Sequence, residues 1–278
     1  AAAARVLAYA AATRKMGEIR QRLVSRANAF MRAGRAATPD DLRLLRQVVA
    51  VAHVAEDWRV VERWSSRMLV HAPDDMDALL LRGDSHLLRG ELADAEACFL
   101  RVKAVHDAAL ALDAGDVRAR SGLTDAWAGV GDVAFAEGKL AEAAAAYGRW
   151  IATAEELVRA EPGNPEWREE LARALARSGD LAAARGELHP ALDSYRRARA
   201  LVKDLLDAAP EDSELLYAHA WNRYCVAGVL IRMSEKDGAR EELARALEEA
   251  NRLVARDPAV RPWRALQYYL KSWNFRGE

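Results

Sequence analysis

The chain of 278 residues contains 41 Lys and Arg and 42 Asp and Glu, which gives a formal net charge of −1. This balance lacks the positive excess that is typical of nucleic-acid-binding domains, so we do not expect nucleic acid as a partner. Aromatic residues make up 7% of the chain, and the composition favours Ala, Leu, Arg and Glu, which form helices readily. The composition therefore argues against a strand-rich fold and predicts an all-α protein.

Cysteine usage and hydropathy indicate a cellular compartment. Cys98 and Cys225 lie far apart within helical patterns, as is typical of small core residues in a reduced protein. No apolar run approaches the roughly 18 residues that span a bilayer. The opening residues, Ala1 to Arg5, are neither an initiator Met nor a signal peptide. We therefore expect a cytoplasmic chain that is a fragment or a processed product.

Residues 1–37 are expected to form a separate, basic helical segment. The only acidic residue among its charged side chains is Glu18. The basic residues are Arg5, Arg14, Lys15, Arg20, Arg22, Arg26, Arg32 and Arg35. Such a helix can dock on an acidic partner, on nucleic acid or on a membrane surface. It can equally fold back on the protein as a solvated capping helix, which is the default expectation.

From residue 38 to residue 258 the sequence repeats itself. Five columns recur with a period of 48 residues in three copies. They are Gly83, Gly131 and Gly179; Gly90, Gly138 and Gly186; Leu92, Leu140 and Leu188; Ala95, Ala143 and Ala191; and Phe99, Tyr147 and Tyr195. Pro162, Pro210 and Pro258 keep the same period.

Each column has a mechanical interpretation in a pair of helices, here called helix A and helix B. The first glycine allows a close approach to helix A, and the second ends helix A as its left-handed C′ residue. The leucine opens helix B, the alanine allows close A–B packing, and the aromatic residue fills the same face. The proline follows the end of helix B.

These columns, at offsets 0, 7, 9, 12 and 16, resemble the tetratricopeptide repeat over about residues 42–265. The resemblance implies a right-handed α-solenoid of antiparallel helix pairs. The repeat is longer than the usual one, like the elongated arrays of bacterial multidomain signalling and defence proteins. A final copy keeps the spacing but has Ala227 and Ser234 in the glycine columns, so we interpret it as a degenerate terminal repeat.

The period also predicts individual helices. Residues 142–161 are expected to form one long helix B, and residues 165–185 the helix A that follows it. Asn164 is the expected N-cap, with Pro165 at the first helical position. Thr38 to Asp41 is expected to cap the first repeat helix. The last segment, 259–278, is predicted to be an aromatic-rich capping helix from about Arg261, which also offers an interface for homo-oligomers.

Catalytic motifs are missing from the sequence. Neither a phosphate-binding Gly-rich loop nor a nucleophile elbow occurs. The histidines lack metal-ligand spacing, so we expect no metal and no cofactor. His86 and Cys98 flank an interhelical turn without a third group, and a structural role is favoured over a Cys–His pair. The protein is therefore not predicted to be an enzyme.

The tetratricopeptide resemblance implies a concave groove lined by the A helices. Asp occupies a position at which many relatives hold Asn, which disfavours a carboxylate ligand and favours a partner segment with Lys or Arg beside apolar residues. The candidate partner-binding residues are Asp77, Asp84, Asp125, Asp132, Asp180, Trp221, Tyr224 and Arg232. The competing interpretations are solvated helix residues for the aspartates and core packing for the aromatic residues.

The favoured function is a scaffold or adaptor that binds a peptide or protein in this groove. The main alternative is a regulatory or sensor segment of a larger bacterial defence or signalling protein, such as a partner of a caspase-like peptidase. An enzyme acting through this chain and a homo-oligomeric scaffold are the other classes. The sequence names neither the partner nor the pathway.

Overall fold

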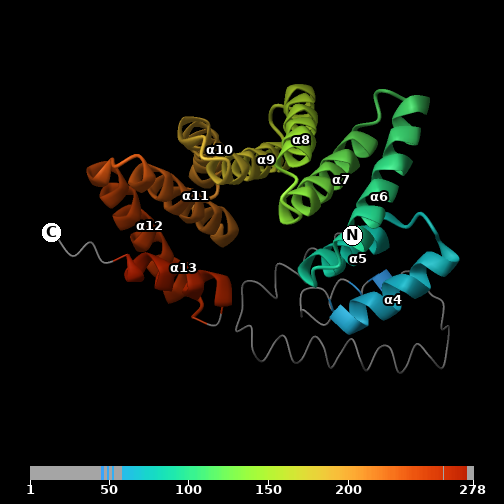
Figure 1. Cartoon of the computed structure of the whole chain (residues 1–278), viewed down its shortest axis with the longest axis horizontal. Helices are drawn as coiled ribbons and strands as arrows, with labels where there is room; N and C mark the ends of the chain where they lie inside the picture. The colour runs from blue at the N-terminus through green and yellow to red at the C-terminus, as the bar shows by residue number, and fades with distance from the viewer. Residues whose placement is uncertain (1–44, 47–48, 50–51, 53–57, 259, 274–278) are drawn as a thin grey trace. The chain divides into compact units, whose positions relative to one another are not determined.

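The computed structural model describes residues 45–46, 49, 52, 58–258 and 260–273. Within these ranges every regular element is a helix (Figure 1), which confirms the all-α prediction. None of the described helices combines the length and hydrophobicity needed to cross a membrane. The predicted basic helix of residues 1–37 and the predicted cap at Thr38 to Asp41 lie outside the described residues. The chain divides after Lys139 into two compact units.

Unit 1 contains four of the labelled helices, and consecutive helices pack against each other. They are α4 (Trp58–His71), α5 (Met76–Leu88), α6 (Leu92–Leu112) and α7 (Val117–Ala136). Helices α5 and α7, both A helices, also contact each other. The core of the unit includes Trp64, Met68, Phe99 and Val102, each at most 5% exposed.

Unit 2 continues the same alternation of helices A and B. It comprises α8 (Leu140–Ala160), α9 (Pro165–Ala184), α10 (Leu188–Ala208), α11 (Ser213–Arg232), α12 (Lys236–Arg256) and α13 (Arg261–Ser272). Each helix packs against the next, as Figure 1 shows for α9, α10 and α11. Helix α13 contacts both α12 and α11, and so takes the place of an A helix beside α11.

The observed helices follow the sequence period. The B helices α6, α8 and α10 begin at Leu92, Leu140 and Leu188, as the leucine column predicted. Helices α8 and α9 match the predicted ranges 142–161 and 165–185 to within two residues. The side chain of Asn164 accepts a hydrogen bond from the Glu166 N–H at 3.0 Å, which confirms its N-cap role.

Acidic N-caps complete this pattern at the other A helices. Asp75, Asp116 and Asp212 cap α5, α7 and α11 by accepting hydrogen bonds from N–H groups of the first helical turn. A carboxylate at a helix N-terminus satisfies an unpaired donor and interacts favourably with the helix dipole. Each A helix therefore begins at a defined residue, which fixes the register of the side chains along it.

The second glycine column ends the A helices as predicted. Gly90, Gly138 and Gly186 have φ of 76°, 76° and 79°. In the degenerate repeat Ser234 takes the left-handed conformation with φ of 65°, although a residue with a Cβ is disfavoured there. The turn geometry is therefore kept in the last full repeat without the glycine.

Close approach at the A helices depends on residues without a Cβ. A Cβ added at Gly179 would lie 2.7 Å from Tyr195 Cε1, and one added at Gly83 would lie 2.8 Å from the Phe99 ring. Gly129 is closer still, at 2.3 Å from Phe99 Cδ1. These rings lie against glycine backbone. The glycines therefore determine how closely helix B packs against the A helices.

The Gly129–Phe99 contact predicts the effect of a one-carbon change. We expect Gly129→Ala to lower the free energy of unfolding by about 1–3 kcal/mol, because Phe99 must leave its rotamer or the helices must separate. The control is Gly148→Ala on α8, where an added Cβ meets nothing within 4 Å. It should raise stability by about 0.5–1 kcal/mol through its helix propensity. Urea unfolding measures both variants, and equal shifts in the same direction would contradict the packing argument.

Candidate functional site

Helix α11 carries three aromatic side chains on one face. Tyr217, Trp221 and Tyr224 are spaced by four and three residues, which places them side by side on a helix. The ring centroids of Tyr217 and Trp221 are 6.3 Å apart, and those of Trp221 and Tyr224 are 5.6 Å apart. Trp221 is 37% exposed, whereas both tyrosines are half-buried. We call these three residues the aromatic row.

The A helices on either side of α11 border the aromatic row. Leu266 of α13 lies in a buried cluster against which Tyr217 and Tyr224 pack. On the other side, Ala172 of α9 shares a buried cluster with Leu215 of α11. The aromatic row therefore lies on α11 beside α13, and α9 meets α11 at Leu215.

Two other predicted binding residues of unit 2 are engaged within the protein. Asp180 accepts a hydrogen bond from the Tyr195 hydroxyl at 2.6 Å and pairs with Arg177 at 3.2 Å. Arg232 donates to the carbonyl of Ala183 at 2.7 Å, in the last turn of α9, where carbonyls lack helical partners. Both side chains therefore have internal structural roles, which the sequence analysis did not anticipate.

The remaining predicted aspartates lie in unit 1 on the neighbouring helices α5 and α7. Asp77 and Asp125 are exposed, and Asp84 and Asp132 are half-buried. Asp77 Oδ2 lies 3.9 Å from Arg46 Nε. Asp84, Asp125 and Asp132 each interact with another group of the protein. The structure thus brings these four carboxylates to two adjacent A helices.

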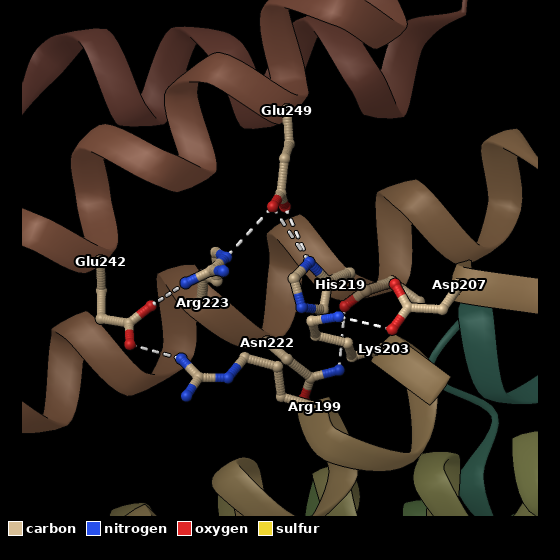
Figure 2. Close-up of polar contacts among 9 residues, drawn as sticks. Arg199, Lys203, Asp207, His219, Asn222, Arg223, Glu242 and Glu249 are labelled. Atoms are coloured by element: carbon tan, nitrogen blue, oxygen red, sulfur yellow. Dashed lines mark hydrogen bonds and ion pairs between the residues drawn. The ribbon is translucent and has the colours of Figure 1, made fainter. Parts of the chain in front are cut away.

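Behind the aromatic row, α11 joins α10 and α12 through a network of charged side chains (Figure 2). Glu249 of α12 accepts from His219 Nδ1 at 3.0 Å and from Arg223 Nε at 3.1 Å. Arg223 Nη1 also donates to Glu242 at 2.6 Å, and Glu242 pairs in turn with Arg199 of α10. Because a carboxylate only accepts, His219 carries a proton on Nδ1. We call these five residues the ion network.

The ion network lies largely out of solvent. The side chains of Arg223, Glu249 and Glu242 are 11%, 14% and 18% exposed. Burial alone would raise the pKa of Glu242, but hydrogen bonds and the charges of Arg199 and Arg223 hold that pKa below its ordinary value. His219 Nε2 and Asn222 Oδ1 are buried and form no hydrogen bond within the described residues, which adds to the cost of the arrangement.

Comparison with solved structures shows which known proteins have a similar fold. The chain is similar to a tetratricopeptide repeat protein from Parabacteroides merdae, with a TM-score of 0.54 and 15% identity, covering 96% of this chain and 84% of that one. The chain has the tetratricopeptide-repeat fold. A second similar structure is a TPR protein from Thermus thermophilus, with a TM-score of 0.49 and 14% identity over 83% of this chain and 99% of that one. No protein-family model and no curated protein matches the chain.

Alignment of the tetratricopeptide repeats shows what the ion network replaces. His219, Arg223 and Glu249 stand 48 residues after Leu171, Leu175 and Leu201, and Glu242 stands 48 residues after Ser194. Leu171 and Leu175 are buried core residues. The last full repeat therefore exchanges apolar packing for charge at aligned positions. The sequence analysis missed the network, although this exchange is visible once the repeats are aligned.

A second polar cluster closes the turn between α5 and α6. His86, Glu91 and Asp94 have ligand atoms within 4.8 Å of one another. However, His86 Nδ1 donates to Glu91 at 2.5 Å, and its Nε2 accepts from Arg82 at 3.2 Å. A cation would have to displace the His86 proton beside the Arg82 and Arg89 guanidinium groups, and Arg89 pairs with Glu91. These contacts describe an ion-pair cluster of the tetratricopeptide turn.

Neither cysteine is activated as a nucleophile. Burial is the largest influence on both thiols and raises the pKa of Cys98 and of Cys225. The reactive form of a cysteine is the thiolate, so a raised pKa keeps both side chains weakly nucleophilic at neutral pH. The His86 ring is held by Glu91 and Arg82 instead of Cys98, and these contacts argue against the Cys–His pair.

The ion network predicts that removing one of its residues destabilises the protein more than replacing four of them together. We expect Arg223→Leu to lower the free energy of unfolding by about 2–4 kcal/mol, because Glu242 and Glu249 lose a largely buried cation. Replacing His219, Arg223 and Glu249 by Leu and Glu242 by Ser, as in the preceding repeat, should restore or exceed the original stability. Urea denaturation distinguishes the two variants. A fourfold variant less stable than Arg223→Leu alone would refute this account.

The lowered pKa of Glu242 predicts a dependence on pH. A carboxylate with a depressed pKa in the folded state contributes stability above its unfolded pKa, whose ordinary value is 4.5, and the contribution is lost as pH falls through the folded pKa. The stability difference between the natural protein and Glu242→Gln should therefore be largest at neutral pH and shrink toward about pH 3. Urea midpoints across this range test the sign, and a constant difference would contradict it.

Proposed function

We propose that this protein is an interaction scaffold whose unit 2 binds a peptide or protein segment along the surface of α9, α11 and α13. The observation that carries the proposal is the aromatic row. Trp221 is 37% exposed between two tyrosine rings that are tilted against it, and exposed Trp and Tyr supply large contact areas at low entropic cost. Because Tyr217 and Tyr224 are packed against the core, the row is rigid before a partner arrives.

The competing interpretation of the aromatic row as ordinary core applies to only part of it. Tyr217 and Tyr224 do cover Ala220 and Leu266, so packing accounts for their position. Trp221 is different, because more than a third of a large apolar side chain faces solvent. We therefore place Trp221 at the centre of the proposed binding surface, with Tyr224 beside it. Asp180 and Arg232 support this surface through their contacts with Tyr195 and Ala183.

The aspartates of unit 1 are proposed as a separate acidic contact region. Asp77 and Asp125 are exposed at equivalent positions of α5 and α7, and Asp84 and Asp132 follow seven residues later on each helix. Such a surface favours basic partner segments through its charge. The scaffold is proposed to act without a cofactor, and the same surfaces would serve a chain that regulates a larger signalling or defence protein.

The proposal predicts a loss of peptide binding when Trp221 is removed. Peptides selected on the full chain from a displayed library of random short sequences should bind Trp221→Ala about 30-fold more weakly, as expected of a central anchor. The control is Leu112→Ala on α6, a large apolar side chain of unit 1 that is 92% exposed and lies outside the proposed surface. Its Kd should change less than threefold. Calorimetric titration measures these values, and equal Kd values for the two variants would reject the surface.

Light scattering on the natural protein and on Tyr268→Ala tests homo-oligomer formation. Tyr268 and Tyr269 of α13 and its C-cap Trp273 are 70%, 46% and 40% exposed, so a self-association interface on α13 would be weakened by Tyr268→Ala. A monomer at all concentrations would leave the peptide-binding surface as the proposed function. A dimer that Tyr268→Ala dissociates would assign α13 to self-association instead.

A further inference from the structure

Helix α13 repeats the sequence register of α11 at the period of 48 residues. Helix α11 begins at Ser213, and α13 begins 48 residues later at Arg261, so each position of α13 has a counterpart on α11. Positions 213, 216, 220 and 223 of α11 are three or four residues apart and share one face. Their counterparts on α13 form a stripe, which we call the α13 stripe: Arg261, Arg264, Tyr268 and Lys271.

On α11, this face is covered by α12, the B helix of the same repeat. Ser213 Oγ accepts a hydrogen bond from Arg256 Nη1 at 3.1 Å, at the C-terminal end of α12. Ala220 is fully buried in a cluster that includes residues of α12, and Arg223 donates to two carboxylates of α12. Helix α12 therefore runs antiparallel to α11, with its last turn beside the first turn of α11.

On α13, the same face is open. Tyr268 stands at the position of Ala220 and is 70% exposed, and the other three residues of the α13 stripe are also exposed. The described helices α11 and α12 pack against α13, but neither covers the α13 stripe. A face that helix B covers in the preceding repeat is therefore accessible here, with an aromatic ring near its centre.

The charges on α13 are all positive. The helix contains Arg261, Arg264 and Lys271 and no acidic residue, and within the described part of the chain no ion pair reaches these three side chains. The stability of α13 does not account for them, because two of them lie in the first turn, where a cation interacts unfavourably with the helix dipole. The α13 stripe therefore favours a negatively charged partner.

Charge distinguishes the candidate occupants of this face. A second copy of α13 would bring the same three cations against the α13 stripe. Residues 1–37 of the same chain carry eight basic residues and one acidic residue, so this segment is repelled as well. A helix that carries carboxylates beside apolar residues complements both the positive charge and the exposed ring of Tyr268.

We propose that the α13 stripe binds an acidic amphipathic helix of another protein, in the place and direction of a helix B. Such a helix docks through its apolar face. Because it runs antiparallel to α13, its C-terminal end lies beside Arg261 and Arg264. Its last carbonyl groups lack helical partners and carry the negative end of its dipole, so both arginines bind them favourably. This surface goes beyond the aromatic row and does not require Trp221.

The contacts of α12 indicate the sequence that the incoming helix needs. In α12, Glu242 accepts from Arg223 at 2.6 Å, and Ala246 lies four residues further along, in the cluster that buries position 220 of α11. The incoming helix should therefore carry a Glu that reaches Lys271. Four residues after this Glu, Gly or Ala should lie opposite Tyr268, because a large side chain there would collide with the ring.

The test is a selection on the full chain from displayed libraries of alanine-rich helical peptides of 21 residues, the length of α12. One position is fixed as Glu, Gln or Lys, the residue four positions later is Gly or Ala, and the remaining surface positions are random. The natural protein should enrich Glu peptides, and the best of them should bind at least fivefold more tightly than its Gln analogue. Fluorescence anisotropy of labelled peptides measures each Kd.

Charge variants assign this preference to the α13 stripe. In Arg264→Gln/Lys271→Gln, the fivefold preference for Glu should fall below twofold, whereas Lys271→Arg keeps the charge and should keep the preference. The matched control removes two exposed arginines of α8, Arg149→Gln/Arg159→Gln, and should also keep the preference. An unchanged preference in Arg264→Gln/Lys271→Gln would overturn the inference.

Tyr268→Ala and Trp221→Ala separate this inference from the proposed function. The Glu peptides should bind Tyr268→Ala about tenfold more weakly, and their Kd for Trp221→Ala should change less than threefold. The reverse order would overturn the inference and assign the helix to the aromatic row. If no helical peptide is enriched, the inference is also overturned, while the selection of short peptides described for Trp221 still decides the proposed function. A dimer that Tyr268→Ala dissociates would overturn the inference by assigning the face to a second copy.

Discussion

The contact that organises the repeats around α6 and α10 is an aromatic side chain of helix B packed against the glycine backbone of an A helix. At Gly129, a single added carbon would overlap the Phe99 ring, and at Gly179 it would crowd Tyr195. The neighbouring alanines of the B helices, Ala95 and Ala191, are fully buried. Because these contacts leave no space for adjustment, they restrict the rotation of α5, α7 and α9 about their axes.

Much of this architecture could be predicted from the sequence because it depends on local chemistry repeated at a constant spacing. Gly138 and Gly186 end helices wherever a left-handed residue is required, and Asn164 begins one wherever a side-chain acceptor is required. In the copy that lacks these glycines, Ser234 keeps the left-handed geometry. The start and end of a helix depend on the few residues at that point in the chain, so the repeat pattern was sufficient to locate them.

The site was less predictable because its contacts join residues that are distant in sequence. The spacing of Asp180 and Tyr195 in the sequence does not predict that the Tyr195 hydroxyl donates to the Asp180 carboxylate. Similarly, Arg232 reaches the Ala183 carbonyl because α9 and α11 are neighbours in the fold. The aromatic row was partly found, since Trp221 and Tyr224 were identified by their repeat positions. Tyr217 was not, because its role arises from packing against the buried cluster of α11, α12 and α13.

The ion network and the aromatic row lie on opposite sides of α11, and our hypothesis is that the charged residues at core positions orient this helix. Leucines at positions 219 and 223 would pack α11 with little preference for its exact rotation, whereas Arg223 must reach Glu242 and Glu249 at once. A directional contact of this kind costs stability and specifies orientation. On this hypothesis, the network keeps the opposite side of α11, which includes Trp221, toward solvent. A surface fixed in this way loses little freedom on binding, so more of the contact energy is expressed as affinity.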